Sequence, residues 1–404
     1  MRFRHKRHAP LDPGALACFI GALIIGLIGP VEFSSAFSPQ ADRLSTLTVS
    51  PTPDPSALLQ EARQAIDAHD WVAAEQTLTT LLTVDPANAQ ASLLLGMLLA
   101  PVVPERAQEW LRRAESDSTQ AEAARQVLDV LASYSPLQAD FYTALGLTMC
   151  SLDEWALAER ALRLALEVNA ANPVALAYLG YALDRQGEDG WPWLERARAM
   201  APTNPHVLYL IGMHWRLSGD LQAARRALTQ AYWAAPDNPA LAAEVGHTLQ
   251  AAGDLAGAER WLRIAVGLAP DEAQWAELLA IFYAETGYDV EGVGMAFLQR
   301  ASADFPQNGV LQACLGWAIY RQGEAGAALE QLQAAVELAP GDARVHYYLG
   351  AVQEHLGDVE AARLAYSTVL TLVPRESYYG ELAARALARL SVTVPSATSS
   401  LSDS

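Results

Sequence analysis

Lysine is almost absent from this sequence, which has a single lysine, Lys6, in 404 residues. The 27 lysine and arginine residues are outnumbered by 46 aspartates and glutamates, which gives a net charge of −19. The first 36 residues hold four of the basic and two of the acidic residues, so the rest of the chain carries −21. Phosphate backbones and anionic lipids repel a body with this charge, which argues against nucleic-acid binding.

Cysteines and catalytic motifs are also scarce. Three cysteines, Cys18, Cys150 and Cys314, are too few for a disulfide framework, and we expect the last two to be buried core thiols. Beyond the first ten residues no two histidines have the HxxxH or HExxH spacing of a zinc site, and GxSxG, GxxxxGK[ST] and GxGxxG motifs are lacking. The sequence therefore predicts no catalytic residue, no metal and no cofactor.

The longest uncharged run lies close to the N-terminus. Residues 1–13 are basic, and residues 14–31, GALACFIGALIIGLIGPV, carry no charge. As a helix this run would be about 27 Å long, which is close to the thickness of a hydrocarbon core. Because the basic residues precede it, the positive-inside rule places residues 1–13 in the cytoplasm and the body of the chain across the membrane.

Two interpretations of this run stay open. An uncleaved, single-pass anchor in the cytoplasmic membrane fits its length, whereas a signal peptide cleaved near Ala36 fits the small residues Ser34 and Ala36. The chain is membrane-bound through residues 14–31 in the first case and secreted in the second. The simple N-terminal segment favours a bacterial source. Residues 32–54, rich in Ser, Thr and Pro, predict a flexible linker.

A period of 34 residues dominates the rest of the sequence. Gly212 and Gly246 are 34 residues apart, and so are Pro236 and Pro270. Each unit contains two apolar-periodic runs, HVLYLIGMHWRL and LQAARRALTQAYWA in one example, with SGD between them. The glycine of SGD can end the first helix in a left-handed conformation, and the aspartate can cap the second. A helical hairpin of this kind buries its apolar face only by stacking on further copies.

This unit resembles the tetratricopeptide repeat, whose pattern of large residues, glycine, alanine and proline is filled by Leu208, Ile211, Gly212, Trp215, Ala224, Leu228, Ala231 and Pro236. The resemblance implies an all-α fold, a right-handed solenoid of about nine helix-turn-helix repeats over residues 55–374. One N-terminal transmembrane or signal helix would precede it. A capping helix is expected over residues 375–391 and a disordered tail over 392–404. Whether an additional helix over 121–136 interrupts the stack is left open.

The resemblance also implies a concave groove lined by the first helices of the repeats. Its partner-facing places come three residues before the signature glycine and one, four and five after it. Tyr, Trp, Arg, His and Met at such places are residue types that anchor partners, although an ordinary solvated surface with salt bridges between repeats is the alternative. The candidates are Tyr181, Asp184, Arg185, Tyr209, Met213, Arg216, His247, Gln250, Trp317, Tyr320, Arg321, Tyr347, Glu354 and His355.

Four tryptophans, Trp71, Trp155, Trp215 and Trp261, fall on or beside the large-residue places, and we expect them to fill the seams between hairpins.

The sequence thus predicts a non-enzymatic scaffold that binds a protein or peptide. The charge of the body favours a neutral or basic partner. The tetratricopeptide clamps that grip chaperone C-termini use paired lysines, which this body does not have. An alternative function is a non-catalytic subunit of an envelope polysaccharide or cell-wall system, in which the groove aromatics would stack on sugars.

Overall fold

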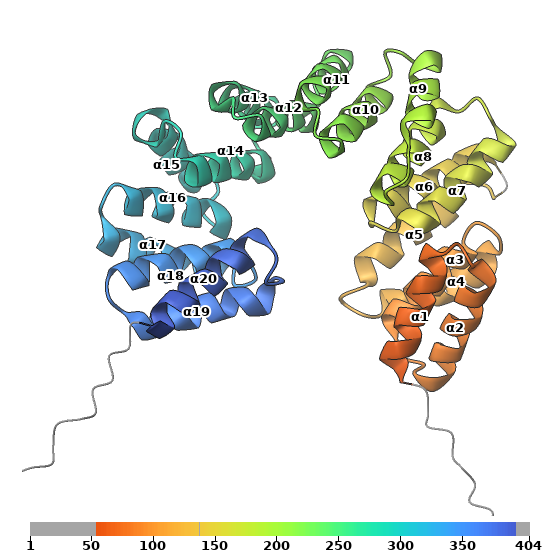
Figure 1. Cartoon of the computed structure of the whole chain (residues 1–404), viewed down its shortest axis with the longest axis horizontal. Coiled ribbons are helices and arrows are strands. Elements are labelled where there is room, and N and C mark those ends of the chain that lie inside the picture. The colour runs from red at the N-terminus through yellow and green to blue at the C-terminus, as the bar shows by residue number, and fades with distance from the viewer. Residues whose placement is uncertain (1–53, 137, 393–404) are drawn as a thin grey trace, which may run out of the picture. The chain divides into compact units, whose positions relative to one another are not determined.

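A computed structural model of the chain describes residues 54–136 and 138–392, and the regular structure of these residues is entirely helical (Figure 1). The predicted all-α, helix-turn-helix solenoid is confirmed for this part of the chain. No helix in it combines the length and apolarity that a membrane crossing requires. The predicted anchor or signal segment, residues 14–31, lies outside the described residues, as do the cleavage site near Ala36 and residues 393–404 of the predicted tail.

Nine helical hairpins follow one another within the described residues, and in all but the seventh each helix packs most extensively on its hairpin partner. In chain order they are α1 (Pro55–Asp67) with α2 (Trp71–Val84), α3 (Ala89–Leu99) with α4 (Pro104–Glu115), α6 (Ala139–Ser151) with α7 (Trp155–Val168), α8 (Pro173–Arg185) with α9 (Trp191–Met200), α10 (Pro205–Leu217) with α11 (Leu221–Ala234), α12 (Pro239–Ala251) with α13 (Leu255–Leu268), α14 (Ala273–Thr286) with α15 (Met295–Asp304), α16 (Gly309–Arg321) with α17 (Ala325–Leu338), and α18 (Ala343–His355) with α19 (Val359–Leu372).

Three further elements lie outside this scheme. Helix α5 (Ala121–Ser133) stands between the second and third hairpins and packs on α4 and α6. A short π-helix, η1 (Val290–Gly294), precedes α15. Helix α20 (Tyr378–Val392) follows the last hairpin and packs on α18 and α19.

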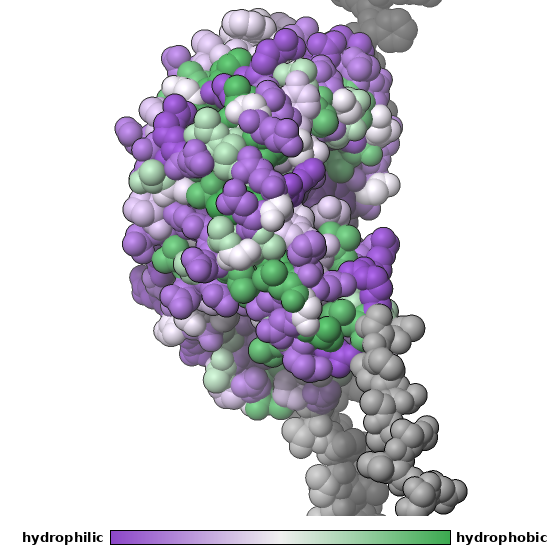
Figure 2. All heavy atoms as spheres, turned by 90° about the vertical axis from the view of Figure 1, so that its left-hand side faces the viewer, coloured by the Kyte–Doolittle hydropathy of each residue, from purple (hydrophilic) through white to green (hydrophobic). Residues whose placement is uncertain are grey.

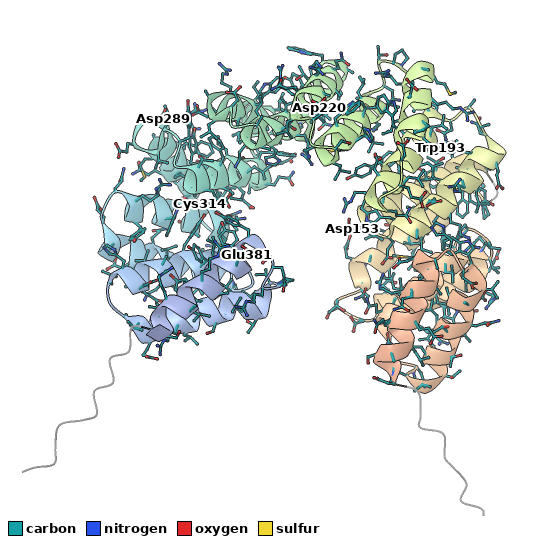
Figure 3. The ribbon with its side chains drawn as sticks, viewed as in Figure 1. Asp153, Trp193, Asp220, Asp289, Cys314 and Glu381 are labelled. Atoms are coloured by element: carbon teal, nitrogen blue, oxygen red, sulfur yellow. The ribbon has the colours of Figure 1, made fainter. Side chains whose placement is uncertain are left out.

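Local chemistry fixes where the helices begin and end. Asp220, labelled in Figure 3, caps α11 by accepting a hydrogen bond from the backbone nitrogen of Ala223, as the SGD pattern predicts. Asn204 and Asn238 cap α10 and α12 in the same way, and each is followed by a proline at the first helical position, where no backbone donor is needed. The repeated capping residues therefore give successive hairpins the same length.

One residue in most hairpin turns adopts a left-handed conformation. Glycine provides it in several turns, for example Gly219 with a φ of 82°. In the first and third hairpins a side chain occupies this place instead, His69 with a φ of 58° and Asp153 with a φ of 59°. A left-handed conformation costs a residue with a Cβ atom roughly 1–2 kcal/mol, so these two turns are held by the contacts around them.

The signature glycine of the first helix lets the second helix approach closely. A Cβ atom on Gly212 would lie 2.5 Å from Cγ of Leu228 on α11. In the fourth hairpin α9 has only ten residues, because the sequence there is shorter, and its first residues approach α8 even more closely. There a Cβ atom on Gly190 would lie 1.9 Å from the carbonyl oxygen of Gly180.

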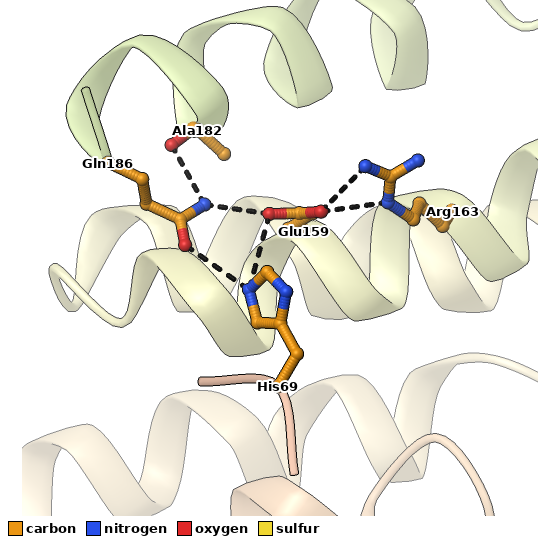
Figure 4. A network of polar contacts seen from close by, with 5 residues as sticks. All are labelled: His69, Glu159, Arg163, Ala182 and Gln186. Carbon is orange, nitrogen blue, oxygen red and sulfur yellow. Dashed lines mark hydrogen bonds and ion pairs between the residues drawn. The ribbon is translucent and has the colours of Figure 1, made fainter. Parts of the chain in front are cut away.

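The first hairpin is tied to the third and fourth by a buried carboxylate (Figure 4). Glu159 on α7 accepts hydrogen bonds from Nε of Arg163 at 2.8 Å and from Nε2 of Gln186, after α8, also at 2.8 Å. Nε2 of His69, in the turn between α1 and α2, lies 3.6 Å from the same carboxylate and 3.4 Å from Oε1 of Gln186. Arg63 of α1 adds an ion pair of 3.1 Å with Glu154. These contacts connect hairpins that are not neighbours in the sequence.

The tryptophans expected to fill the seams do so, since Trp71, Trp155, Trp215 and Trp261 are partly buried against the hydrophobic core. The two cysteines within the described residues, Cys150 and Cys314, are buried free thiols, which confirms that prediction. Figure 3 labels Cys314.

Burial raises the pKa of each of these thiols from 9.0 to about 12. Because the folded chain holds them neutral, the contribution of the two thiols to stability is full below pH 9. It is lost as the pH rises from 9 to about 12, where only the unfolded chain ionises. In a Cys18→Ser chain we expect no reaction with a thiol reagent near pH 8 until urea unfolds the protein. Rapid labelling of the folded chain would contradict the burial of these residues.

Candidate functional site

Aromatic side chains gather where α18 packs on α16 and on α20. We define the C-terminal aromatic cluster as Trp317, Tyr320, Tyr347, Tyr348, His355 and Tyr379. The ring of Trp317 stacks on that of Tyr348 with centroids 4.5 Å apart and planes inclined by 11°. Trp317 and Tyr320 lie 5.2 Å apart, Tyr320 meets His355 edge-on at 5.4 Å, and Tyr347 lies 5.6 Å from Tyr379. The helices α16, α18 and α20 thus contribute rings to one surface.

Polar groups on α14 and α18 fix this cluster in place. The hydroxyl of Tyr379 donates a hydrogen bond of 2.7 Å to Oε1 of Glu285, a residue 94 positions earlier in the chain. Nε of Arg344 donates to the Tyr379 hydroxyl at 3.1 Å, and it lies 3.7 Å from the carboxylate of Glu285. Because Arg344 and Glu285 form an ion pair, the polar side of the cluster has little net charge.

Three tyrosines of the cluster, Tyr347, Tyr348 and Tyr379, are held in their neutral form. Burial is the largest cause that raises the pKa of Tyr347, Tyr348 and Tyr379 above the ordinary value for tyrosine. Tyr348 is 2% exposed, whereas Trp317, Tyr320, Tyr347 and Tyr379 are only partly buried. The partly exposed members therefore offer ring faces, and Tyr347 and Tyr379 add hydroxyl groups that stay protonated.

A second candidate site is a cavity between the first helices α8, α10 and α12. This cavity of about 280 Å³ is lined by the rings of Tyr178 and Tyr209, by His206 and Leu241, and by the carboxylate-bearing Glu244. Burial raises the pKa of Tyr209, and Glu244 raises it further, so its hydroxyl is also neutral. We call this space the α10–α12 pocket; its size suits one large side chain.

The carboxylate of Glu244 does not stand alone at the α10–α12 pocket. Nη1 of Arg216 donates to Oε2 of Glu244 at 2.5 Å, and His247 lies beside this pair. Burial lowers the pKa of His247, Glu244 opposes that effect, and Arg216 adds to it, so the imidazole is mostly neutral at pH 7. The predicted residues Tyr209, Arg216 and His247 are thus brought together around a carboxylate.

Two segments of the sequence, residues 216–281 and residues 315–377, each match a family model described as a tetratricopeptide repeat. The chain belongs to the tetratricopeptide repeat family. Tetratricopeptide repeats typically bind protein or peptide partners, and proteins built from them are usually non-catalytic scaffolds. No curated protein sequence matches this chain.

Solved structures of low sequence identity, among them a tetratricopeptide repeat protein, resemble the chain. One from Parabacteroides merdae is 15% identical, with a TM-score of 0.48, and the alignment covers 63% of this chain and 98% of that protein. Tom70 from yeast is 13% identical, with a TM-score of 0.41 and coverage of 84% and 89%. PilF from Pseudomonas aeruginosa is 16% identical, with a TM-score of 0.40 and coverage of 60% and 95%.

Two of the fourteen predicted contact residues, Tyr181 and Met213, are buried in this tetratricopeptide repeat array, and the side chain of a third, Asp184, is only 8% exposed, which corrects the expectation that these three line an open surface. Tyr181 and Met213, 9% and 7% exposed, follow the signature glycine directly and belong to a core cluster formed by α8, α9, α10 and α11. The carboxylate of Asp184 accepts hydrogen bonds from Nδ1 of His214 at 2.8 Å and from the backbone of Gly190 at 3.0 Å. These side chains join one repeat to the next.

The other predicted residues lie at the surface or partly buried, and several of them also connect repeats. Arg185 lies over the ring of Trp155, with its guanidinium carbon 4.3 Å from the centroid. Arg321 donates to the carbonyl oxygen of Ala284 on α14 at 3.3 Å. Glu354 accepts hydrogen bonds from Tyr366 at 2.8 Å and from Arg389 at 2.9 Å. Gln250 is partly buried at the end of α12.

The sequence analysis did not identify several residues in or beside the C-terminal aromatic cluster and the α10–α12 pocket. Tyr178, Glu244 and Tyr348 each stand two residues before a signature glycine, and His206 and Arg344 stand six residues before one. Polar and aromatic residues recur at these two places, and this recurrence is the signal that could have identified them. Tyr379 lies on α20, outside the repeat pattern, so the period could not have identified it.

Proposed function

We propose that this protein is a membrane-tethered or exported scaffold that binds an extended protein or peptide segment along the first helices of its repeats. The observation that carries the proposal is the C-terminal aromatic cluster, in which Trp317 of α16, Tyr347 of α18 and Tyr379 of α20 stay partly exposed. Rigid aromatic side chains with hydroxyl groups are favourable anchors for partner side chains. The acidic body favours a segment of neutral or basic character.

Removal of two partly exposed rings of the cluster should weaken binding strongly. We expect Trp317→Ala and Tyr320→Ala together to reduce the affinity for peptides selected from a random peptide array by at least about tenfold, as the loss of a central aromatic anchor does. Affinity is measured by calorimetry, with circular dichroism to show that the helices persist. Trp233→Ala is the matched control, because Trp233 lies on the second helix α11 and is 69% exposed; its affinity should equal that of the unaltered chain.

Equal loss of affinity in the control would contradict the assignment of the surface, and so would unchanged affinity in the double variant. A glycan array distinguishes the alternative function. Tyr348 stacks on one face of Trp317, so only the other face of that ring could receive a sugar. Saturable sugar binding that disappears in the same double variant, without peptide binding, would favour the envelope polysaccharide or cell-wall subunit instead.

The location of the scaffold is a separate part of the proposal and rests on the uncharged run of residues 14–31. We expect cell fractionation to place the chain in the membrane fraction, or in the medium if it is cleaved near Ala36. Protease added to spheroplasts should digest membrane-bound repeats, because the basic residues before the run keep only the N-terminus inside. Repeats that stay protected in spheroplasts would show that the orientation is wrong.

A further inference from the structure

A cavity of about 450 Å³ opens between the second helices α13 and α15, where residues of α14 and η1 also line it. On the side of the chain that carries α15 and α17, hydrophobic residues lie in small groups between hydrophilic ones (Figure 2). The cavity is an apolar space within this mixed surface. Val266, Leu279, Val293 and Phe297 line it, and Arg263 and Arg300 are the charged residues of its wall.

The cavity exists because the seventh repeat begins its second helix late. After α14 ends, Gly287 and Asp289, the latter labelled in Figure 3, both adopt left-handed conformations, with φ of 66° and 45°. The π-helix η1 follows, and α15 then has ten residues where most second helices have fourteen. The missing turn leaves the apolar side of α13 partly uncovered. Single-turn π-helices occur frequently at functional sites.

The two arginines give the cavity its chemical character. Nη2 of Arg263 donates to the hydroxyl of Tyr283 at 3.0 Å, and its Nε lies 3.2 Å from the carboxylate of Glu259, so this guanidinium is held in place. The guanidinium of Arg300 lies 6.0 Å from the ring centroid of Phe297, and among the described residues it forms no ion pair with a carboxylate. The carboxylate of Asp289 lies against Gly292 in η1 and does not line the cavity.

We propose that this cavity binds a small amphipathic carboxylate, a molecule with a short apolar chain or ring and one carboxylate group. The volume falls in the range of small-molecule sites, and the lining is mostly apolar with a few polar groups, as such sites require. A guanidinium presents paired donors that match a carboxylate, and Arg300 is the arginine not already neutralised by an acidic neighbour. Positive groups at an apolar cavity stand out in a chain whose net charge is −19.

Substitution of Gly267 by a larger residue should close the cavity and leave the fold intact. Gly267 lies near the end of α13 and lines the cavity, and a Cβ atom added to it would meet no atom within 4 Å. The equivalent residue of the preceding repeat, 34 positions earlier, is Trp233, so a large side chain is compatible with this helical position. Glycine is the poorest helix former except proline, so Gly267→Leu should fill the space without lowering stability.

The test is calorimetric titration of the full chain with octanoate, octanol and octylamine. We expect octanoate to bind saturably and at least about tenfold more tightly than the neutral and cationic analogues, since a charge-assisted hydrogen bond supplies about that factor. Arg300→Gln should weaken octanoate binding at least about tenfold. Gly267→Leu should abolish it with no fall in the unfolding midpoint, while Gly326→Leu, an open glycine position on α17, should bind octanoate like the unaltered chain.

Equal binding of the three analogues would overturn the proposal, because the arginines would then play no part. Unchanged octanoate binding in Gly267→Leu, or absence of binding in the unaltered chain, would overturn it as well. None of these outcomes bears on the peptide-binding surface, since no residue that lines the cavity belongs to the C-terminal aromatic cluster.

Discussion

Replacement of Gly190 by alanine should lower the free energy of unfolding by about 3 kcal/mol, at the upper end of the usual cost of overpacking. The φ of Gly190 is −83°, which alanine adopts without strain, so the cost is steric alone. The new Cβ atom would lie 1.9 Å from the carbonyl oxygen of Gly180 and 2.6 Å from its carbonyl carbon. Because these are backbone atoms of α8, relief requires the two helices to separate. Urea unfolding followed by circular dichroism measures the loss.

Gly326→Ala is the matched control for this variant. A Cβ atom at this position on α17 would meet nothing within 4 Å, so the same chemical change should raise stability by about 0.5 kcal/mol through helix propensity. If both substitutions raise the urea midpoint, the close approach of α8 and α9 is not as the structure describes.

The second large effect is expected at Glu159, whose side chain is only 5% exposed. Glu159→Ala should lower the free energy of unfolding by about 2–3 kcal/mol, because it removes charge-assisted hydrogen bonds to Arg163 and Gln186 and leaves a gap beside His69. The loss should be felt in the first hairpin, since the network is one of the ties between that hairpin and α7. Hydrogen exchange of α1 should therefore become faster, in addition to the fall in the urea midpoint.

Glu381→Ala tests whether the burial of Glu159 is the reason for the large loss of stability expected in Glu159→Ala. Glu381 forms the same kind of pair with the residue four positions later, Arg385, at 2.8 Å, but the two side chains are 53% and 72% exposed. An exposed pair of this kind contributes at most about 0.5 kcal/mol. Similar losses in the two variants would mean that the environment of Glu159 has no special importance.

Much of the fold follows from short-range features that the sequence displays directly. Gly219 and Asp220 predict the turn between α10 and α11, and Gly212 predicts the close approach of Leu228, because each depends on residues within one repeat. The π-helix η1 could not be predicted in this way. The sequence near Asp289 shows extra residues, but the conformation they adopt depends on how α14 and α15 pack around them.

The candidate site was harder to predict than the fold because it depends on neighbouring repeats. Tyr209, Arg216 and His247 were expected on the first helices, and they do surround a common carboxylate. Tyr181 and Met213 occupy equally favourable places in their repeats but are covered by adjacent helices. A pattern confined to one repeat carries no information on how closely the next first helix approaches, and this distance decides which residues stay accessible.

The capping residues of α10 and α12 have a consequence for how the length of the array can change. Asn204 with Pro205 and Asn238 with Pro239 are identical junctions, 34 residues apart. Recombination between the two would delete or duplicate one complete hairpin in frame and recreate the same junction at the seam. Such recombination would lengthen or shorten the protein by whole hairpins and would need no new junction sequence between them. The length of the array can therefore change while the structure of each hairpin stays the same.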